Sequence, residues 1–217
     1  LGGLVARPVA PAGLGRPMRI ARAALVLLLA FALAGAAAGP PPYRRVDWGG
    51  WRGNCPDTRT KVLMRDAKRE PTVGNLEAPG PPPAPAYVFR DGGCLLAWVR
   101  IEDPYTGAVL NDPQRIHVDH VLAIEEVHRA GGWRWSREKK GQFFNWPFNH
   151  LAVAASANES KGSRSPPAWH PRPEFLCRYV EIRATVRVAW RLAPPGEAEA
   201  RFMRETLTGC HPLGPGH

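Results

Sequence analysis

The sequence contains few cysteines, and their spacing argues against a common class of metal site. Only four cysteines occur among 217 residues, and no two of them form the C-x-x-C pair that zinc-binding domains use. A glycine-rich P-loop is also absent, which disfavours a nucleoside triphosphatase of that class. The chain has no internal repeat, and its length fits one domain with a terminal extension.

A long apolar segment suited to crossing a membrane is absent as well. The apolar run Ala23–Leu33 is shorter than the roughly 20 residues that a membrane span needs. It follows a basic stretch and precedes Ala36–Ala38, which offers an A-x-A cleavage site. We therefore predict that residues 1–38 comprise upstream sequence and a secretory signal peptide, Met18–Ala38, so that the mature protein is secreted and has no stable membrane association. An uncleaved anchor is the alternative.

Acidic residues are scarce relative to basic ones, 19 against 29, which gives a net charge of +10. Residues 1–38 carry four of the arginines and no acid, so the remainder keeps a net charge of +6. A basic balance favours polyanionic partners such as nucleic acid, anionic lipid or cell-wall polymer. It also fits an ordinary soluble protein rich in arginine, so charge alone does not identify the partner.

An even number of cysteines behind a signal peptide predicts two disulfides. Four cysteines allow three pairings, and order along the chain favours Cys55–Cys94 and Cys177–Cys210. A zinc site remains the alternative.

Hydrophobic patterning predicts an α+β fold in a single domain, residues 39–217, with a proline-rich loop at residues 77–86. A turn at Asp91–Gly93 would join the first two strands of an N-terminal hairpin. The predicted strands are Tyr87–Arg90, Cys94–Val99, Ile116–Val118 and His150–Val153. The predicted helices are 58–66, 122–129, 136–144, 154–161, 175–192 and 197–207, of which the last two form a C-terminal helical hairpin.

Large aromatic side chains gather in the middle of the chain, and we predict that they pack in the core. Base stacking by one of them is the alternative. They are Trp133, Trp135, Phe143, Phe144, Trp146 and Phe148.

A set of polar residues between Ile116 and Lys161 points to metal-assisted chemistry. Asp119 and His120 end a predicted strand, and Asn158 follows on a predicted helix. Carboxylate and amide oxygens are hard ligands that suit Mg²⁺, and a neutral imidazole can take a proton from water near neutral pH. The pattern predicts a phosphodiesterase centre with one divalent ion, Mg²⁺ or alternatively Mn²⁺.

Asp119-His120, Asn149 and Asn158-x-x-Lys161-Gly162 resemble the HNH, or ββα-metal, nucleases. The likeness is to the branch that includes the C-terminal domain of GmrSD-type restriction endonucleases and many small secreted bacterial proteins. It covers about residues 44–210. Peripheral similarities are Thr58–Leu63, Pro104–Gly107, Trp135-Ser136 and Cys210.

This resemblance implies a ββα-metal core and a role for each residue. Asp119 and Asn158 would bind the metal, and His120 would be the general base that activates water. Asn149 would brace the loop that orients His120. Lys161 would support the site or contact phosphate.

The sequence departs from the family pattern at three positions. His117 occupies a position where an acid is common, and Glu159 one where a basic residue is usual. Leu122, two residues after the Asp-His pair, occupies a position where a proline is often found. None of these changes removes a proposed ligand. Each site residue alone would have an ordinary structural role, so the ordered set carries the interpretation.

Together these features predict a secreted, monomeric, metal-dependent endonuclease that cuts DNA, with RNA as the alternative substrate, and has little sequence specificity. Two other functions remain open. The chain could be a non-catalytic secreted module that binds polyanions, or an exported nuclease toxin that requires an immunity protein.

Overall fold

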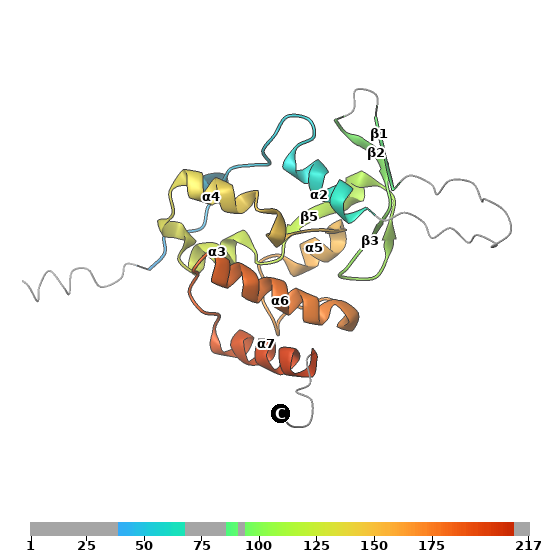
Figure 1. Cartoon of the computed structure of the whole chain (residues 1–217). Coiled ribbons are helices and arrows are strands. Elements are labelled where there is room, and N and C mark those ends of the chain that lie inside the picture. Colours follow the sequence, from blue (N-terminus) through green and yellow to red (C-terminus); the bar gives the residue numbers. More distant parts are fainter. Residues whose placement is uncertain (1–38, 68–85, 91–93, 211–217) are drawn as a thin grey trace, which may run out of the picture. The chain divides into compact units, whose positions relative to one another are not determined.

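The computed structural model describes residues 39–67, 86–90 and 94–210 (Figure 1). The chain divides into two compact units, Leu1–Gly39 and Pro40–His217, and the elements below belong to the second. The predicted signal peptide and the predicted turn at Asp91–Gly93 lie outside the described residues. So does the proline-rich loop, apart from Ala86.

The predicted α+β class is confirmed. The described strands form three antiparallel pairs. These pairs are β1 (Tyr87–Phe89) with β2 (Leu96–Val99), β3 (Ile101–Glu102) with β4 (Val109–Leu110), and β5 (Ile116–His120) with β6 (His150–Ala154).

Helices account for most of the remaining described chain, and two of them begin at side chains that cap them. Asp57 accepts a hydrogen bond from the amide of Thr60, and Ser136 accepts one from the amide of Lys139. The α-helices are α2 (Thr58–Asp66), α3 (Ile124–Arg129), α4 (Arg137–Phe144), α5 (Ala155–Lys161), α6 (Pro173–Ala189) and α7 (Glu197–Cys210). The short 3₁₀ helices are η1 (Arg45–Trp48), η2 (Pro113–Arg115), η3 (Gly132–Arg134) and η4 (Pro147–Asn149).

The β5–β6 pair and α5 form the part of the fold that positions the predicted site. In the register of the pair, His120 lies opposite His150, and Asp119 opposite Leu151. Helix α5 follows β6 directly and packs against both strands. The order strand, strand, helix is the one that the resemblance implies, although order alone does not identify the family.

Two hydrophobic clusters hold these elements. One contains Val62 of α2 and Ile116 of β5, together with residues of β2 and β6. The other centres on Trp48, Phe143 and Phe144, each with no exposed surface, and includes residues of α3 and α6. Strand β5 supplies Ile116 and Val118 to the first cluster, and Val121 and Leu122, which follow the strand, belong to the second.

The prediction that the large aromatics are core residues was wrong for Phe148, which is 71% exposed. Its neighbour Asn149 directs its side chain inward to the backbone of Leu122. The short helix η4 therefore leaves Phe148 on the surface.

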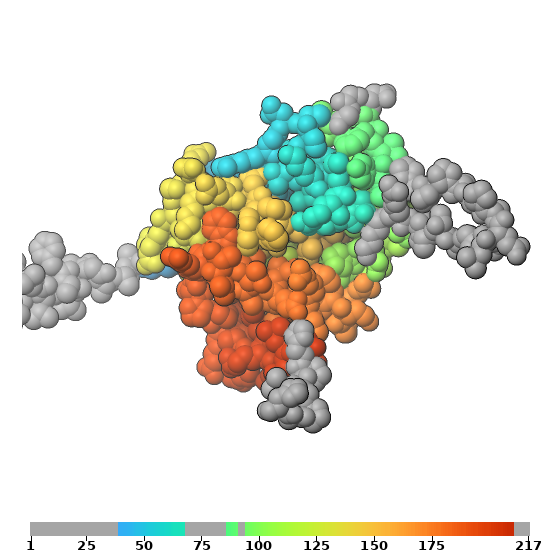
Figure 2. All heavy atoms as spheres, in the orientation of Figure 1, coloured from blue at the N-terminus to red at the C-terminus, as the bar shows by residue number. Residues whose placement is uncertain are grey.

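Both predicted disulfides are present, and no described cysteine is free, so the zinc alternative is contradicted. Cys177 lies near the start of α6 and Cys210 ends α7, so this bond joins the two helices, which lie side by side in Figure 1. On the face seen in Figure 2, the blue segment that contains η1 lies along the yellow segment that contains α4. Within the described ranges, no helix has the length and hydrophobicity needed to span a membrane.

Candidate functional site

A cavity of about 320 Å³ opens at the end of β5. Asp119 and His120 line it from β5, and Asn158 lines it from α5. The structure therefore brings together three residues that are far apart in the sequence. The other two predicted site residues, Asn149 and Lys161, lie behind the cavity with no exposed surface. We call this cavity the β5 cleft.

Asp119 is held by two donors and is only 5% exposed. Its Oδ1 lies 3.0 Å from the ammonium group of Lys161, and its Oδ2 accepts a hydrogen bond of 2.5 Å from the hydroxyl of Tyr105. Burial and the nearby Asp119 carboxylate raise the pKa of Tyr105 well above its usual value, so the phenol stays a donor. Because Lys161 is fully buried and also donates to the carbonyl of His120, its position suits support of the site better than contact with phosphate.

The His120 ring is fixed in an orientation that suits a base. Its Nε2 lies 2.8 Å from the carbonyl oxygen of Phe144, and the ring stacks on Trp51 with 8° between their planes. A carbonyl oxygen only accepts, so Nε2 carries the proton and Nδ1 keeps its lone pair. Burial lowers the pKa of His120 well below its usual value, which keeps the imidazole neutral at neutral pH.

His150 contacts His120 from behind and was not predicted as part of the site. Its Nε2 lies 3.1 Å from Nε2 of His120 and 2.9 Å from the same Phe144 oxygen. Burial lowers the pKa of His150 to about 4, so this ring also stays neutral near pH 7. Because His120 and His150 are directly opposed across the β5–β6 pair, a predicted register would have revealed the contact.

Asn149 fixes the chain immediately after His120. Its Oδ1 accepts from the amide of Leu122 at 2.8 Å, and its Nδ2 donates to the carbonyl of Leu122 at 3.1 Å. The backbone oxygen of Asn149 also accepts from the amide of Val121 at 2.9 Å. These bonds support the predicted bracing role, and they explain why α3 begins at Ile124 rather than at the predicted Leu122.

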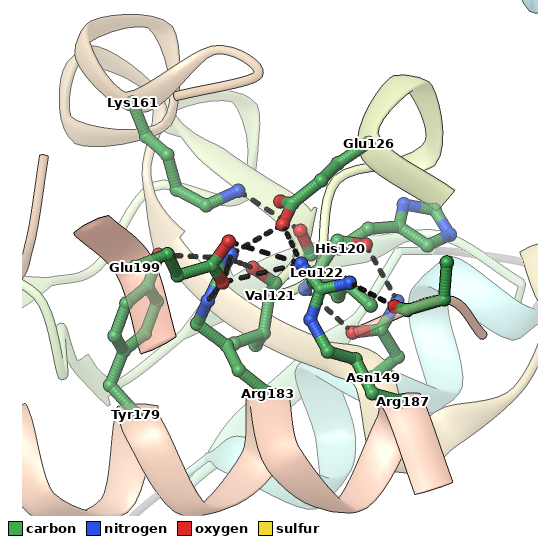
Figure 3. A network of polar contacts seen from close by, with 11 residues as sticks. His120, Val121, Leu122, Glu126, Asn149, Lys161, Tyr179, Arg183, Arg187 and Glu199 are labelled. Carbon is green, nitrogen blue, oxygen red and sulfur yellow. Dashed lines mark hydrogen bonds and ion pairs between the residues drawn. The ribbon is translucent and has the colours of Figure 1, made fainter. Parts of the chain in front are cut away.

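A buried cluster of two arginines and two glutamates lies behind the same loop (Figure 3). Arg183 of α6 pairs with Glu126 of α3 at 2.6 Å and with Glu199 of α7 at 2.5 Å. Arg187 pairs with the same two carboxylates at 2.5 and 3.1 Å. Arg183 also donates to the carbonyl of Val121 at 3.1 Å, so the cluster touches the residue next to His120.

The ionic state of this cluster follows from its pairing. Burial alone would lower the pKa of Arg183, but Glu126, Tyr179 and Glu199 outweigh that effect and raise it. Burial raises the pKa of Glu126 despite the two arginines. The spacing of Arg183 and Arg187 by one helical turn among apolar residues was the sequence signal for the cluster, and it was missed.

Asn158 is half-buried, and its Nδ2 lies 3.4 Å from Nδ1 of His117, which is a long hydrogen bond. If Nδ2 donates to His117, the carbonyl oxygen of Asn158 is the atom left for a cation. Oxygens of Asp119 and Asn158 fit Mg²⁺, which keeps several waters and uses few protein ligands. No cluster of three or more His, Cys, Asp or Glu suited to a metal occurs among the described residues, so such an ion would depend on these two oxygens, water and substrate.

Arg45 is the cationic group at the cleft that sequence reasoning missed. Its guanidinium lies 4.1 Å from the centre of the Phe144 ring and donates to the carbonyl of Gly49 at 2.8 Å. The second acid that lines the same cleft, besides Asp119, is Glu125, which pairs with Arg129 at 2.6 Å. Arg45 therefore presents positive charge to an anion beside His120.

Comparison with known proteins does not identify the chain. No protein-family model, no curated protein and no solved structure matches it. The functional assignment therefore depends on the residues of the β5 cleft and their geometry.

Proposed function

We propose that this chain is a metal-dependent endonuclease of the HNH type that hydrolyses phosphodiester bonds of DNA, with RNA as the alternative substrate. The observation that supports this proposal is that Asp119, His120 and Asn158 line one cleft. The tautomer of His120, with its Nδ1 lone pair unoccupied, is the one that a general base requires.

In the proposed reaction, His120 takes a proton from water through Nδ1 while the water oxygen bonds to phosphorus. The bond from phosphorus to the leaving oxygen breaks, and that oxygen then takes a proton from solvent. The carbonyl of Phe144 accepts from Nε2–H both before and after the transfer to Nδ1, and the Trp51 ring holds the imidazole plane. A bound Mg²⁺ or Mn²⁺, held by Asp119 and Asn158, would neutralise charge on the phosphate and on the leaving oxygen. Arg45, which lines the cleft from η1, would contact a phosphate oxygen.

The backbone around His120 is held by groups that do not touch substrate. Lys161 bonds the carbonyl of His120, Arg183 that of Val121, and Asn149 the amide and carbonyl of Leu122. These contacts fix the position of the base before substrate arrives. Preorganisation of this kind lowers the free energy needed to reach the transition state.

We further propose that the protein acts outside the cell as a monomer. Two disulfides are typical of proteins that fold in an oxidising compartment. The predicted signal peptide agrees with this location. Contacts to phosphate carry no sequence information, so little sequence specificity is expected.

One observation favours a second function, a non-catalytic module that binds polyanions. Both carboxylate oxygens of Asp119 already accept hydrogen bonds, from Lys161 and Tyr105. The Lys161 charge would also compete with a metal ion for Asp119. A protein with this function would retain DNA without cutting it.

Digestion of supercoiled plasmid by the oxidised protein, residues 39–217, separates these functions. With Mg²⁺ or Mn²⁺ we expect nicking and linearisation that EDTA abolishes. His120→Ala should cut about 100-fold more slowly or worse, because general-base catalysis contributes at least that factor. The exposed His170→Ala is the matched control and should cut at the parental rate.

Equal cutting by His120→Ala and the parent would remove His120 from the mechanism. DNA retention with an intact plasmid under all metal conditions would reject the nuclease and favour the binding module. Circular dichroism of each variant would show whether loss of cutting reflects loss of folding.

A further inference from the structure

Basic side chains gather where η1 and α4 pack together, next to the β5 cleft. Helix α4 packs on η1, and the two segments adjoin on the face in Figure 2. Acidic residues of these segments are Asp47 and Glu138, and Glu138 accepts from Gln142 at 3.4 Å. The basic residues, which we call the η1–α4 patch, are Arg45, Arg137, Lys139 and Lys140 of these two elements, together with Arg52, whose guanidinium lies beside Gly141 of α4, and Arg134, which ends η3 shortly before α4.

Within the described part of the chain, no patch residue forms an ion pair with a carboxylate. Some exposed cations elsewhere do form such pairs, as Arg178 with Glu181 at 3.2 Å and Arg201 with Glu197 at 3.0 Å. Except for Lys140, which is partly buried, the patch residues are exposed. Their charge is therefore available to an external anion.

Aromatic rings support these cations and make the patch continuous with the cleft. Lys140 lies 5.8 Å from the centre of the Trp48 ring, and Lys139 lies 4.8 Å from that of Trp135. The two tryptophan rings are themselves 5.9 Å apart. At the other end, Arg45 lies over Phe144 and also lines the β5 cleft.

Local helix stability does not explain this arrangement. Arg137, Lys139 and Lys140 all lie in the first four residues of α4. The amino end of a helix carries partial positive charge, so cations there are unfavourable. An external polyanion would offset that repulsion.

We infer that the η1–α4 patch binds the sugar-phosphate backbone of double-stranded DNA and leads it into the β5 cleft. The choice of DNA rests on the proposed function, whereas the location rests on the unpaired cations and their continuity with Arg45. The ring-supported cations connect α4 to Arg45 at the cleft, so a duplex that enters the cleft would meet several of them. The contact would be insensitive to base sequence.

The test measures binding without cutting. A fluorescent 20-base-pair duplex is titrated in EDTA with the oxidised protein at several salt concentrations, and anisotropy is recorded. Lys139→Gln/Lys140→Gln should weaken binding at least about tenfold, and the slope of log affinity against log salt should fall by about 2, since each phosphate contact contributes about 0.9. Arg201→Gln/Arg204→Gln on α7 removes the same charge from another surface and should change affinity less than about threefold.

Vesicles of phosphatidylcholine with 30% phosphatidylserine serve as the competing polyanion. Equal weakening by the two double variants would overturn the inference, because only net charge would then matter. Unchanged DNA binding by Lys139→Gln/Lys140→Gln would also overturn the inference. So would a result in which this double variant loses binding to the vesicles but keeps its binding to DNA. Because the titration contains no metal, a patch that binds DNA in a protein that never cuts would refute the nuclease proposal and leave this inference standing.

Discussion

Positively charged side chains occupy two contrasting settings in this molecule. Arg183 and Arg187 are buried and share two carboxylates, Glu126 and Glu199. The cations of the η1–α4 patch are exposed, apart from the partly buried Lys140, and have no carboxylate partner among the described residues. Four of them lie over aromatic rings: Arg45, Arg134, Lys139 and Lys140. The first set is arranged to join α3, α6 and α7, and the second is arranged to face outward.

The difference indicates how to separate structural charge from functional charge. A buried cation is stable only with partners, so removing it leaves its carboxylates unpaired. An exposed, unpaired cation contributes little to stability, and its loss should affect binding alone. His120 and His150 form a third case, because burial lowers the pKa of each ring and keeps it neutral near pH 7.

The largest expected effect is a loss of stability when the buried cluster of two arginines and two glutamates is broken. Arg183→Met leaves Glu126 and Glu199 with Arg187 as their remaining partner in the cluster, and we expect a loss of about 3–5 kcal/mol in the free energy of unfolding. Lys139→Gln should change it by less than about 0.5 kcal/mol. Urea unfolding of both variants measures these changes. Similar losses in the free energy of unfolding would contradict the distinction between buried, paired cations and exposed, unpaired ones.

Acidification should destabilise the fold through the neutral histidines. The folded pKa of His150 is about 4, against about 6.5 when unfolded, so the unfolded chain binds the proton first as pH falls. The contribution of neutral His150 to the free energy of unfolding is complete above about pH 6.5. It is lost progressively down to about pH 4, a change of about 3 kcal/mol. His120, whose pKa is also lowered, changes stability in the same direction.

Urea unfolding at pH 7 and pH 4.5 measures this change. His150→Gln keeps a donor for the Phe144 carbonyl and should reduce the pH dependence. The exposed His170→Ala should preserve it. An unchanged pH dependence in His150→Gln would show that His150 titrates normally in the folded protein.

The smallest expected effect is a difference in turnover rate between variants of the two buried arginines. Arg183→Lys and Arg187→Lys both weaken the pairs with Glu126 and Glu199, but only Arg183 bonds Val121. We expect Arg183→Lys to lower the turnover rate about tenfold with little change in KM, equivalent to about 1.4 kcal/mol, and Arg187→Lys to leave it near the parental value.

Hydrogen exchange of the Leu122 amide gives a readout that does not depend on cutting. Arg183→Lys should exchange faster at this amide than Arg187→Lys, because the loop after His120 loses one of its anchors. Identical exchange in the two variants would show that Arg183 only supports the packing of the helices.

Local signals predicted much of the fold. The predicted helix 58–66 matches α2, the predicted helix 136–144 starts one residue before α4, and the even cysteine count with chain order predicted both disulfides. The convergence of Asp119 with Asn158 was predicted from the residue types and the family resemblance, because no periodicity relates residues on a strand and a later helix.

Contacts that depend on tertiary packing were missed. His150 meets His120 through strand register, and register could not be fixed from two short strands. Arg45 reaches the β5 cleft from a segment far along the chain. Phe148 was assigned to the core by residue type alone, whereas the turn of η4 decided its exposure.

The central claim is that Asp119 and Asn158 hold one divalent ion while His120 acts on water beside it. The most direct test is the rate of plasmid cleavage as a function of Mg²⁺ concentration for the parent, Asn158→Ala and His120→Ala. We expect Asn158→Ala to require more Mg²⁺ and to recover activity as the ion is raised, and His120→Ala to stay at least about 100-fold slower at saturating Mg²⁺. Parental rates and parental Mg²⁺ dependence in both variants would contradict the claim.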